Sequence, residues 1–178
     1  MIETDRLILR CWEPRDAAPF AALNADPEVM EHLGGPIVRA QSDAVIARIE
    51  AAQASNGHCF WAVECKADGA MIGFCGLHRP DHAGTSVEGE VEIGWRLART
   101  AWGRGYALEA ARASLAWGWK NTDLARIAAW TVPANVRSWG LMERLGMVRR
   151  PELDFAHPAF GPGHPLSRHI VYMAERPG

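Results

Sequence analysis

Two glycines, Gly103 and Gly105, stand two residues apart, directly before an alanine-rich run with helical spacing. Glycine adopts positive φ angles without strain and lets a ligand approach bare backbone. The first turn of a helix leaves its N–H groups unpaired and carries a partial positive charge. A glycine turn that opens a helix therefore predicts a binding site for an anion, usually a phosphate.

Two common phosphate-binding motifs do not fit this turn. A P-loop needs Lys followed by Ser or Thr after its last glycine, whereas Tyr106 and Ala107 follow here. A dinucleotide-binding fingerprint needs a third glycine where Leu108 stands, within a parallel βαβ unit. A third arrangement fits better: a pyrophosphate held between a strand and a helix start, in a mostly antiparallel sheet.

Hydrophobic periodicity supports that arrangement. Helical spacing covers residues 17–25, 27–32, 40–55, 106–119 and 135–146. Strand-like runs cover residues 6–12, 58–66, 70–80, 87–97, 125–132 and 168–175. The three central runs are joined by short turns and predict an antiparallel meander, so the fold class is α+β. With no linker long enough to divide the chain, we expect residues 1–178 to form one domain.

Composition limits the kinds of binding partner and the cellular compartment that we expect for this protein. The formal charge is −2, without the concentrated positive face that nucleic acid requires. No apolar run reaches membrane-spanning length and no signal peptide is evident, which predicts a cytoplasmic protein. The four cysteines (Cys11, Cys59, Cys65 and Cys75) lack a C-x-x-C pair and are expected to be buried, reduced thiols. The oligomeric state stays open, a homodimer included.

Three ordered motifs carry a family resemblance. The segments "EIGWRL" and "WGRGYALEA" resemble the acetyl-CoA-binding signature of the GNAT N-acetyltransferases, and "NVRSWGLMERLGM" resembles their N-x-x-S…L-G-F helix. Together with "TDRLILR" near the start, they resemble the RimJ/RimL-like branch, the ribosomal-protein-alanine N-acetyltransferase type. The resemblance extends from about Glu3 to Met147. It implies a GNAT fold, in which a mixed, mostly antiparallel sheet splays into a V between flanking helices.

The resemblance also implies roles for individual residues. Acetyl-CoA would be the co-substrate, with its pyrophosphate on the backbone N–H groups of the turn. The residues of that turn are Trp102, Gly103, Arg104, Gly105, Tyr106 and Ala107, with Trp102 in place of the family's Gln or Arg. The backbone of Leu97 would pair with the pantetheine arm, Asn135 would hydrogen-bond to it, and Ser138 would lie near the thioester sulfur. For Asn135, N-capping is a second role; for Ser138, a solvated helix position is the alternative.

The implied reaction is direct attack of a primary amine on the thioester, with a protein N-terminus, an amino acid or a small amine as acceptor. An ammonium group must first lose a proton, and a carboxylate acting through water is the usual base. Glu92 and Glu90 are the candidates, and Glu92 is preferred because it is closer to where the strands should part. A solvated glutamate face is the alternative for both.

One position departs from the family pattern. Met142 stands where many GNAT enzymes have a tyrosine that protonates the leaving thiolate. Because a thiol has a pKa near 8.5, its release as thiolate at pH 7 costs only about 2 kcal/mol, which a hydrogen bond from Ser138 or water can offset. Met142 favours an alternative, an acyl-CoA-binding module without catalysis, whereas Asn135 and Ser138 speak against it.

The histidines of the C-terminal tail do not form a metal motif. Asp154, His157, His164 and His169 have spacings that match no zinc site, and the surrounding prolines and glycines indicate a loop. We therefore expect no metal, and a loop that borders the acceptor site.

Overall fold

A computed structural model describes residues 1–161 and 163–178. Its nine strands are β1 Ile2–Glu3, β2 Leu7–Arg10, β3 Phe60–Cys65, β4 Met71–His78, β5 Glu92–Leu97, β6 Arg126–Thr131, β7 Val148–Arg149, β8 Phe155–Ala156 and β9 Arg168–Glu175. The α-helices are α1 Ala17–Asn24, α2 Pro27–Met30, α3 Arg39–Asn56, α4 Tyr106–Asn121 and α5 Val136–Arg144. Short 3-10 turns cover Pro14–Asp16, Arg99–Ala101 and Pro151–Leu153.

The strands form one mixed sheet in the order β1-β2-β3-β4-β5-β6-β9-β7, with β8 pairing to β9. Every neighbouring pair is antiparallel except β5 and β6, which run parallel. The predicted fold class, a mostly antiparallel sheet flanked by helices, is confirmed.

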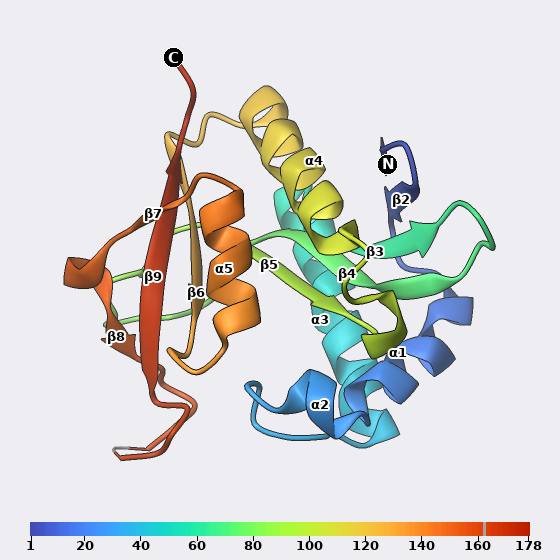
Figure 1. The fold of residues 1–178 in the computed structure, drawn as a ribbon, viewed down its shortest axis with the longest axis horizontal. Helices are drawn as coiled ribbons and strands as arrows, with labels where there is room; N and C mark the ends of the chain where they lie inside the picture. Colours follow the sequence, from blue (N-terminus) through green and yellow to red (C-terminus); the bar gives the residue numbers. More distant parts are fainter. Residues whose placement is uncertain (162) are drawn as a thin grey trace.

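The parallel pair is where the sheet opens. β5 and β6 share a single register position, Glu92 opposite Ala128, where Ala128 N–H donates to the carbonyl of Val91 at 2.9 Å. Beyond this point β5 continues to Leu97 and β6 continues to Thr131, but the two strands no longer pair with each other. Figure 1 shows β6 and β9 on one side and β2 to β5 on the other, with α5 beside the former and α4 beside the latter. The sheet therefore splays into a V.

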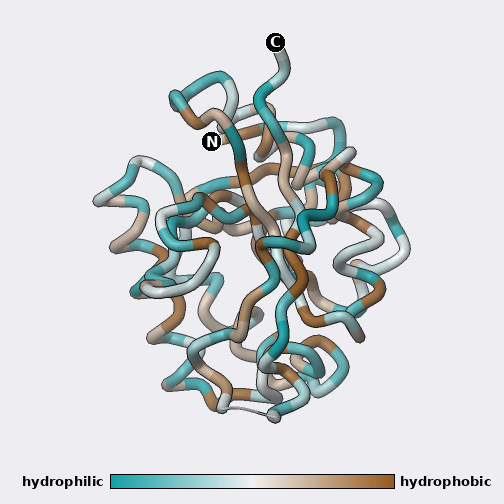
Figure 2. Tube along the Cα trace, turned by 90° about the vertical axis from the view of Figure 1, so that its left-hand side faces the viewer, coloured by the Kyte–Doolittle hydropathy of each residue, from teal (hydrophilic) through white to brown (hydrophobic). Residues whose placement is uncertain are grey.

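The helices divide between the two faces of the sheet. On one face, Ser114 of α4 lies over β4, with its Oγ 3.7 Å from the Sγ of Cys75. On the other face, Phe20 of α1 packs edge-on against Phe74 of β4, with ring centroids 6.0 Å apart. Because side chains alternate along a strand, odd-numbered residues of β4 and β5 face α4 and even-numbered residues face α1. Most strongly hydrophilic segments lie in the outer loops (Figure 2).

The predicted strand over residues 87–97 was too long, because β5 begins only at Glu92. Residues before it form successive turns, with Glu88 N–H bonded to Thr85 and Glu90 N–H bonded to Val87. Val87 is nevertheless buried against Phe155 in a small second core. Val87 is apolar because of this distant contact, and its spacing from Val91 and Ile93 gave the false appearance of a longer strand.

The cysteine prediction holds in part. All four thiols are free, and Cys59, Cys65 and Cys75 are buried. Cys11 is exposed, since it follows the last residue of β2 and leaves the sheet. Within the residues described, no helix combines the length and the apolar character needed to cross a membrane.

Candidate active site

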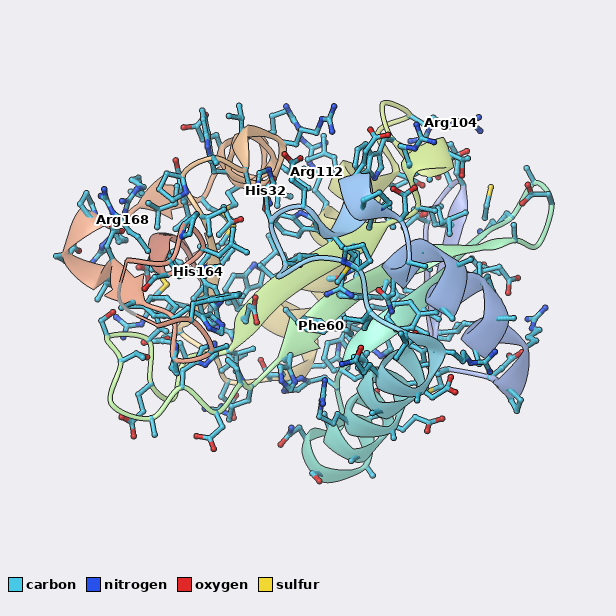
Figure 3. The ribbon with its side chains drawn as sticks, turned by 90° about the horizontal axis from the view of Figure 1, so that it is seen from below. His32, Phe60, Arg104, Arg112, His164 and Arg168 are labelled. Carbon is cyan, nitrogen blue, oxygen red and sulfur yellow. The ribbon has the colours of Figure 1, made fainter. Side chains whose placement is uncertain are left out.

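A large cleft of about 1430 Å³ lies where the sheet splays. Its walls come from β5, the glycine turn and start of α4 on one side, and from β6 and α5 on the other. Residues of α2 and the segment after it, including His32, close the third side. Figure 3 shows His32 and Phe60, which both line the cleft, from below. The sequence-predicted site residues in this cleft are Glu92, Leu97, Trp102, Gly103, Gly105, Tyr106, Ala107, Asn135 and Ser138.

The glycine turn presents unpaired backbone donors. Gly103 and Gly105 have φ angles of +72° and +79°, which bring the chain into α4 with Gly105 as its N-cap. Within the described part of the chain, no backbone N–H from Gly103 to Ala107 donates a hydrogen bond. These donors add to the positive end of the 16-residue helix α4, so the turn can accept an anion.

Arg6, which precedes β2, contacts the glycine turn through a hydrogen bond to its backbone. Its Nη1 donates to the carbonyl of Arg104 at 2.9 Å, and its Nε donates to the carboxylate of Glu109 at 2.7 Å. The guanidinium also lies 4.7 Å from the ring centre of Tyr106. Because the Arg104 carbonyl is held toward Arg6, this contact fixes the orientation of the turn. Arg104 is exposed and does not line the cleft.

Trp102 braces the same turn rather than offering a donor to the cleft. Its indole N–H donates to the carbonyl of Leu97 at 2.8 Å, and its backbone N–H donates to Arg99. The guanidinium of Arg137, from α5, lies 4.7 Å from the Trp102 ring and so spans the two walls. The sequence did not reveal the roles of Arg6 and Arg137, since their contacts join distant segments. Arg6 contacts residues about 100 positions away, and Arg137 contacts Trp102, 35 positions away.

The backbone of β5 faces the gap beside β6. The N–H of Ala98 bonds to β4, whereas the carbonyl of Val91 accepts from β6. Since the N–H and C=O of one residue in a strand point to the same side, the main-chain groups of Ile93, Trp95 and Leu97 also point toward β6. β6 no longer pairs there, so this edge is free to bind an extended ligand.

Asn135 caps α5. Its side-chain oxygen accepts from the N–H of Ser138 at 3.3 Å, and its amide donates to Thr131 at 3.0 Å. The N-capping role considered from the sequence is therefore present. Ser138 is half-buried in the cleft wall, and its hydroxyl makes no hydrogen bond to the part of the chain described.

The two candidate bases differ in their surroundings. Glu90 forms an ion pair with Arg126 and is not part of the cleft lining. Glu92 lines the cleft beside the last pairing between β5 and β6, and its carboxyl group has no hydrogen-bond partner among the described residues. Burial raises the pKa of Glu92 to about 8. A carboxyl group with that pKa can exchange protons near neutral pH.

Met142 lies in the wall of the cleft and is 1% exposed. It lies on α5 one turn after Ser138 and packs in the main hydrophobic core. A thioether offers no proton, so this wall supplies no acid at that position.

The histidines of the tail pack with aromatic rings. His157 contacts the rings of His82 and His169, with centroids 4.9 and 4.8 Å apart, and burial lowers its pKa to about 4. Phe155 joins this cluster to Trp130, which lines the cleft. Across residues 1–161 and 163–178, no group of three ligand side chains suits a metal ion.

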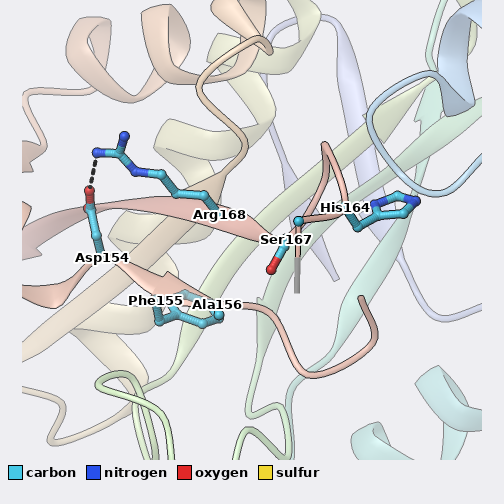
Figure 4. Close-up of a pocket in the computed structure, with 7 residues that line it drawn as sticks. Asp154, Phe155, Ala156, His164, Ser167 and Arg168 are labelled. Carbon is cyan, nitrogen blue, oxygen red and sulfur yellow. Dashed lines mark hydrogen bonds and ion pairs between the residues drawn. The ribbon is translucent and has the colours of Figure 1, made fainter. Parts of the chain in front are cut away.

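A second, shallower pocket of about 430 Å³ lies beside this tail (Figure 4). Asp154 and Arg168 line it and pair with each other at 3.2 Å. Asp154 also pairs with Arg149 at 2.6 Å. Its charged groups are thus already neutralised within the protein, and it contains none of the predicted site residues.

The splayed sheet, the β5 edge and the donor-lined turn together form a V-shaped cleft suited to an extended anionic substrate. Comparison with known families agrees: residues 6–148 match the "Acetyltransferase (GNAT) domain" model. The chain therefore belongs to the GNAT acetyltransferase family, whose members use acetyl-CoA as the acetyl donor.

Individual proteins and solved structures are similar to this chain over most of its length. The uncharacterised Bacillus subtilis protein YkkB is 36% identical over 145 residues, which are 81% of this chain and 83% of that protein. An Agrobacterium tumefaciens acetyltransferase structure aligns with a TM-score of 0.79 at 26% identity, over 98% of this chain and 93% of that one. RimL, a ribosomal L7/L12 α-N-protein acetyltransferase solved with coenzyme A, aligns at 0.76 and 13% identity over 97% and 95% of the two chains.

Proposed function

We propose that this protein is an N-acetyltransferase that moves the acetyl group of acetyl-CoA to a primary amine. The observation that carries the proposal is the row of unpaired backbone N–H groups from Gly103 to Ala107 at the mouth of the cleft. RimL, an α-N-protein acetyltransferase of the same fold, supports a RimJ/RimL-like assignment and a protein N-terminus as one acceptor class. Amino acids and small amines are the other classes in the proposal.

The described residues fit acetyl-CoA. The pyrophosphate would accept hydrogen bonds from the turn residues, and Gly103, Gly105 and Ala107 leave room for phosphate oxygens near the backbone. The pantetheine arm would pair with the free edge of β5 at Trp95 and Leu97. The carbonyl of Leu97 already accepts one hydrogen bond, from Trp102, and retains a second lone pair. Asn135 would add a side-chain contact from the opposite wall.

Glu92 would act as the general base. The acceptor ammonium must become neutral before nitrogen can attack the thioester carbon, and a carboxylate can take that proton through one water. Glu92 supports this role because it lies in the cleft without a competing partner, whereas Glu90 is paired with Arg126. A raised pKa makes the carboxylate a stronger base than an ordinary glutamate once it is ionised.

The sulfur would leave as a thiolate. As the nitrogen–carbon bond forms, the carbon–sulfur bond breaks and its electron pair stays on sulfur. The extra proton on the new amide nitrogen passes to solvent, from which the thiolate is protonated to the coenzyme A thiol. With Met142 in place of a proton donor, the hydroxyl of Ser138 would donate a hydrogen bond to the departing sulfur. A net contribution of about 1 kcal/mol is typical for such a bond, and it offsets part of the cost of releasing a thiolate at pH 7.

A thiol-release assay tests the proposal. The protein is mixed with acetyl-CoA and a panel of primary amines, and free coenzyme A thiol is measured together with the acetylated product. We expect thiol release that depends on at least one amine. Binding of acetyl-CoA by calorimetry without release for any amine would instead favour the binding module that Met142 suggests, and no binding at all would remove the coenzyme site.

A further inference from the structure

Arg96 is a guanidinium that folding leaves without a carboxylate partner. It lies on the same face of β5 as Glu92, and it lines the cleft. Its Nε is screened from solvent and has no hydrogen-bond partner, and none of the ion pairs among residues 1–161 and 163–178 includes Arg96. Buried polar atoms are nearly always paired in folded proteins, so an unpaired one in a residue that lines a cleft requires a reason.

Neutral groups hold the Arg96 side chain in place. Its Nη1 donates to the side-chain oxygen of Asn24 at 2.6 Å, and Asn24 in turn donates to Ser42 at 2.9 Å. Asn24 and Ser42 are both 0% exposed. The guanidinium also lies 5.3 Å from the ring centre of Phe74. Burial lowers the pKa of Arg96 to about 10, which leaves it charged at neutral pH.

An aromatic surface separates Arg96 from Glu92. Between them, Gly94 has no side chain, and the ring of Phe60 covers it so closely that a Cβ there would lie 2.9 Å from ring atoms. Phe60 stacks on Phe74 at 4.9 Å with an interplanar angle of 19°. Residues four apart on one strand lie about 13 Å apart. The cleft thus has a carboxyl group at one end, a guanidinium at the other and apolar rings between.

We propose that the acceptor amine also carries a carboxylate, which Arg96 binds while the amine lies near Glu92. This inference rests on the proposed N-acetyltransferase function. A carboxylate would bind at Nη2, which Asn24 leaves unused, and once seated there it would also offer an acceptor to the screened Nε on the same edge of the guanidinium. Because the two ends of the surface are far apart, the amine and carboxylate should be separated by several bonds, as in an ω-amino acid or in a peptide whose N-terminus precedes an acidic side chain.

Matched acceptor pairs test this proposal, with affinity for the coenzyme A-saturated protein measured by calorimetry. One pair is ω-aminohexanoate and ω-aminohexanamide, and the other is the tripeptide amides Ala-Asp-Ala and Ala-Asn-Ala. We expect the carboxylate member of at least one pair to bind about 10- to 100-fold more tightly, as for other charge-assisted contacts. The pair that shows the preference identifies the source of the carboxylate.

Variants then assign the preference to one side chain. Arg96→Gln should remove it, Arg96→Lys should keep part of it, and Arg112→Gln should leave it intact. Arg112 is an exposed residue of α4 that neither lines the cleft nor pairs with a described residue (Figure 3). Coenzyme A affinity of each variant reports that the protein is folded.

Two results would overturn the inference: equal affinities within both pairs for the natural protein, or a preference that survives in Arg96→Gln. Either result leaves amine-dependent thiol release, measured with hexylamine, in place. A failure of the proposed function is distinct, because it abolishes thiol release with every amine, hexylamine included.

Discussion

Arg6 and Glu109 form a two-pronged ion pair, with Nε and Nη2 of the arginine 2.7 and 2.6 Å from one carboxylate oxygen. The pair joins the residue before β2 to the first turn of α4, and the same guanidinium holds the Arg104 carbonyl. Ion pairs of this exposure contribute at most about 1 kcal/mol to the free energy of unfolding. Its larger effect should therefore be on the shape of the glycine turn.

Arg6→Gln is expected to weaken coenzyme A binding about 5-fold while lowering the free energy of unfolding by no more than about 1 kcal/mol. The reason is that the Arg104 carbonyl loses its partner and can rotate toward the ligand. Calorimetry and denaturant unfolding measure the two quantities. Arg15→Gln, which also removes exposed ion pairs, is the control and should leave coenzyme affinity unchanged. Equal affinities of the two variants would contradict the prediction.

Gly105→Ala should impair both stability and coenzyme binding. A non-glycine residue at a φ of +79° costs about 1–2 kcal/mol, and its Cβ would lie 3.4 Å from the Arg6 guanidinium. Relief of this strain would reorient the N–H groups of the turn, so we expect about a 10-fold loss of affinity. Gly57→Ala is the matched control, because Gly57 has a φ of +73° in open space at the end of α3. It should lose similar stability with no change in coenzyme affinity.

The rate of acetylation should rise through about pH 8 if Glu92 is the base. Only the ionised carboxylate accepts a proton, and the pKa of this group is about 8. With a saturating alkylamine of pKa near 10, Glu92→Gln should lower kcat about 100-fold at pH 7.5 and remove the rise near pH 8. Its remaining rate should follow deprotonation of the acceptor alone. A Glu92→Gln profile that coincides with that of the natural protein would exclude Glu92 as base, and Glu90→Gln serves as the comparison.

The same substitution should stabilise the fold. In the unfolded chain this carboxyl group ionises from about pH 4.5, whereas in the folded protein it keeps its proton until about pH 8. The folded state binds more protons in this interval, so its stability falls as pH rises and the full penalty is present above pH 8. Glu92→Gln removes the penalty and should gain roughly 2–4 kcal/mol on going from pH 5 to pH 9.

Denaturant unfolding at several pH values measures that gain. In Glu90→Gln an ion pair with Arg126 is lost instead, so this variant should be destabilised by at most about 1 kcal/mol. If the gain in the free energy of unfolding of Glu92→Gln stays constant or shrinks as pH rises, the carboxyl group is not held neutral in the folded protein. Substitutions at catalytic positions often raise the stability of a protein while lowering its catalytic rate.

The sequence was sufficient for the turn, the helix that follows it and the strand that carries Glu92, because these depend on local backbone rules. It did not predict where β5 begins, since Val87 is buried by Phe155 from the far end of the chain. The short strands β7 and β8 were also missed, because two residues are too few to show a period.

Side-chain partners in the site were the least predictable part. Arg96 depends on Asn24, and Glu90 differs from Glu92 only because Arg126 lies opposite it. Each contact joins residues that are 36 or more positions apart, so no local sequence pattern could predict it. Conversely, the capping role of Asn135 is local and was anticipated.

The single register position between β5 and β6 has a mechanical consequence. Beyond it, the main-chain groups of β5 that point toward β6 have no partner strand among the described residues, although the Leu97 carbonyl accepts one hydrogen bond from Trp102. In the proposed complex, the pantetheine amides would take the place of the missing strand, so that the sheet becomes continuous only while the donor is bound. Loss of the spent coenzyme would then return the protein to two half-sheets joined at one point, and the acceptor would meet a complete wall only while the coenzyme is bound.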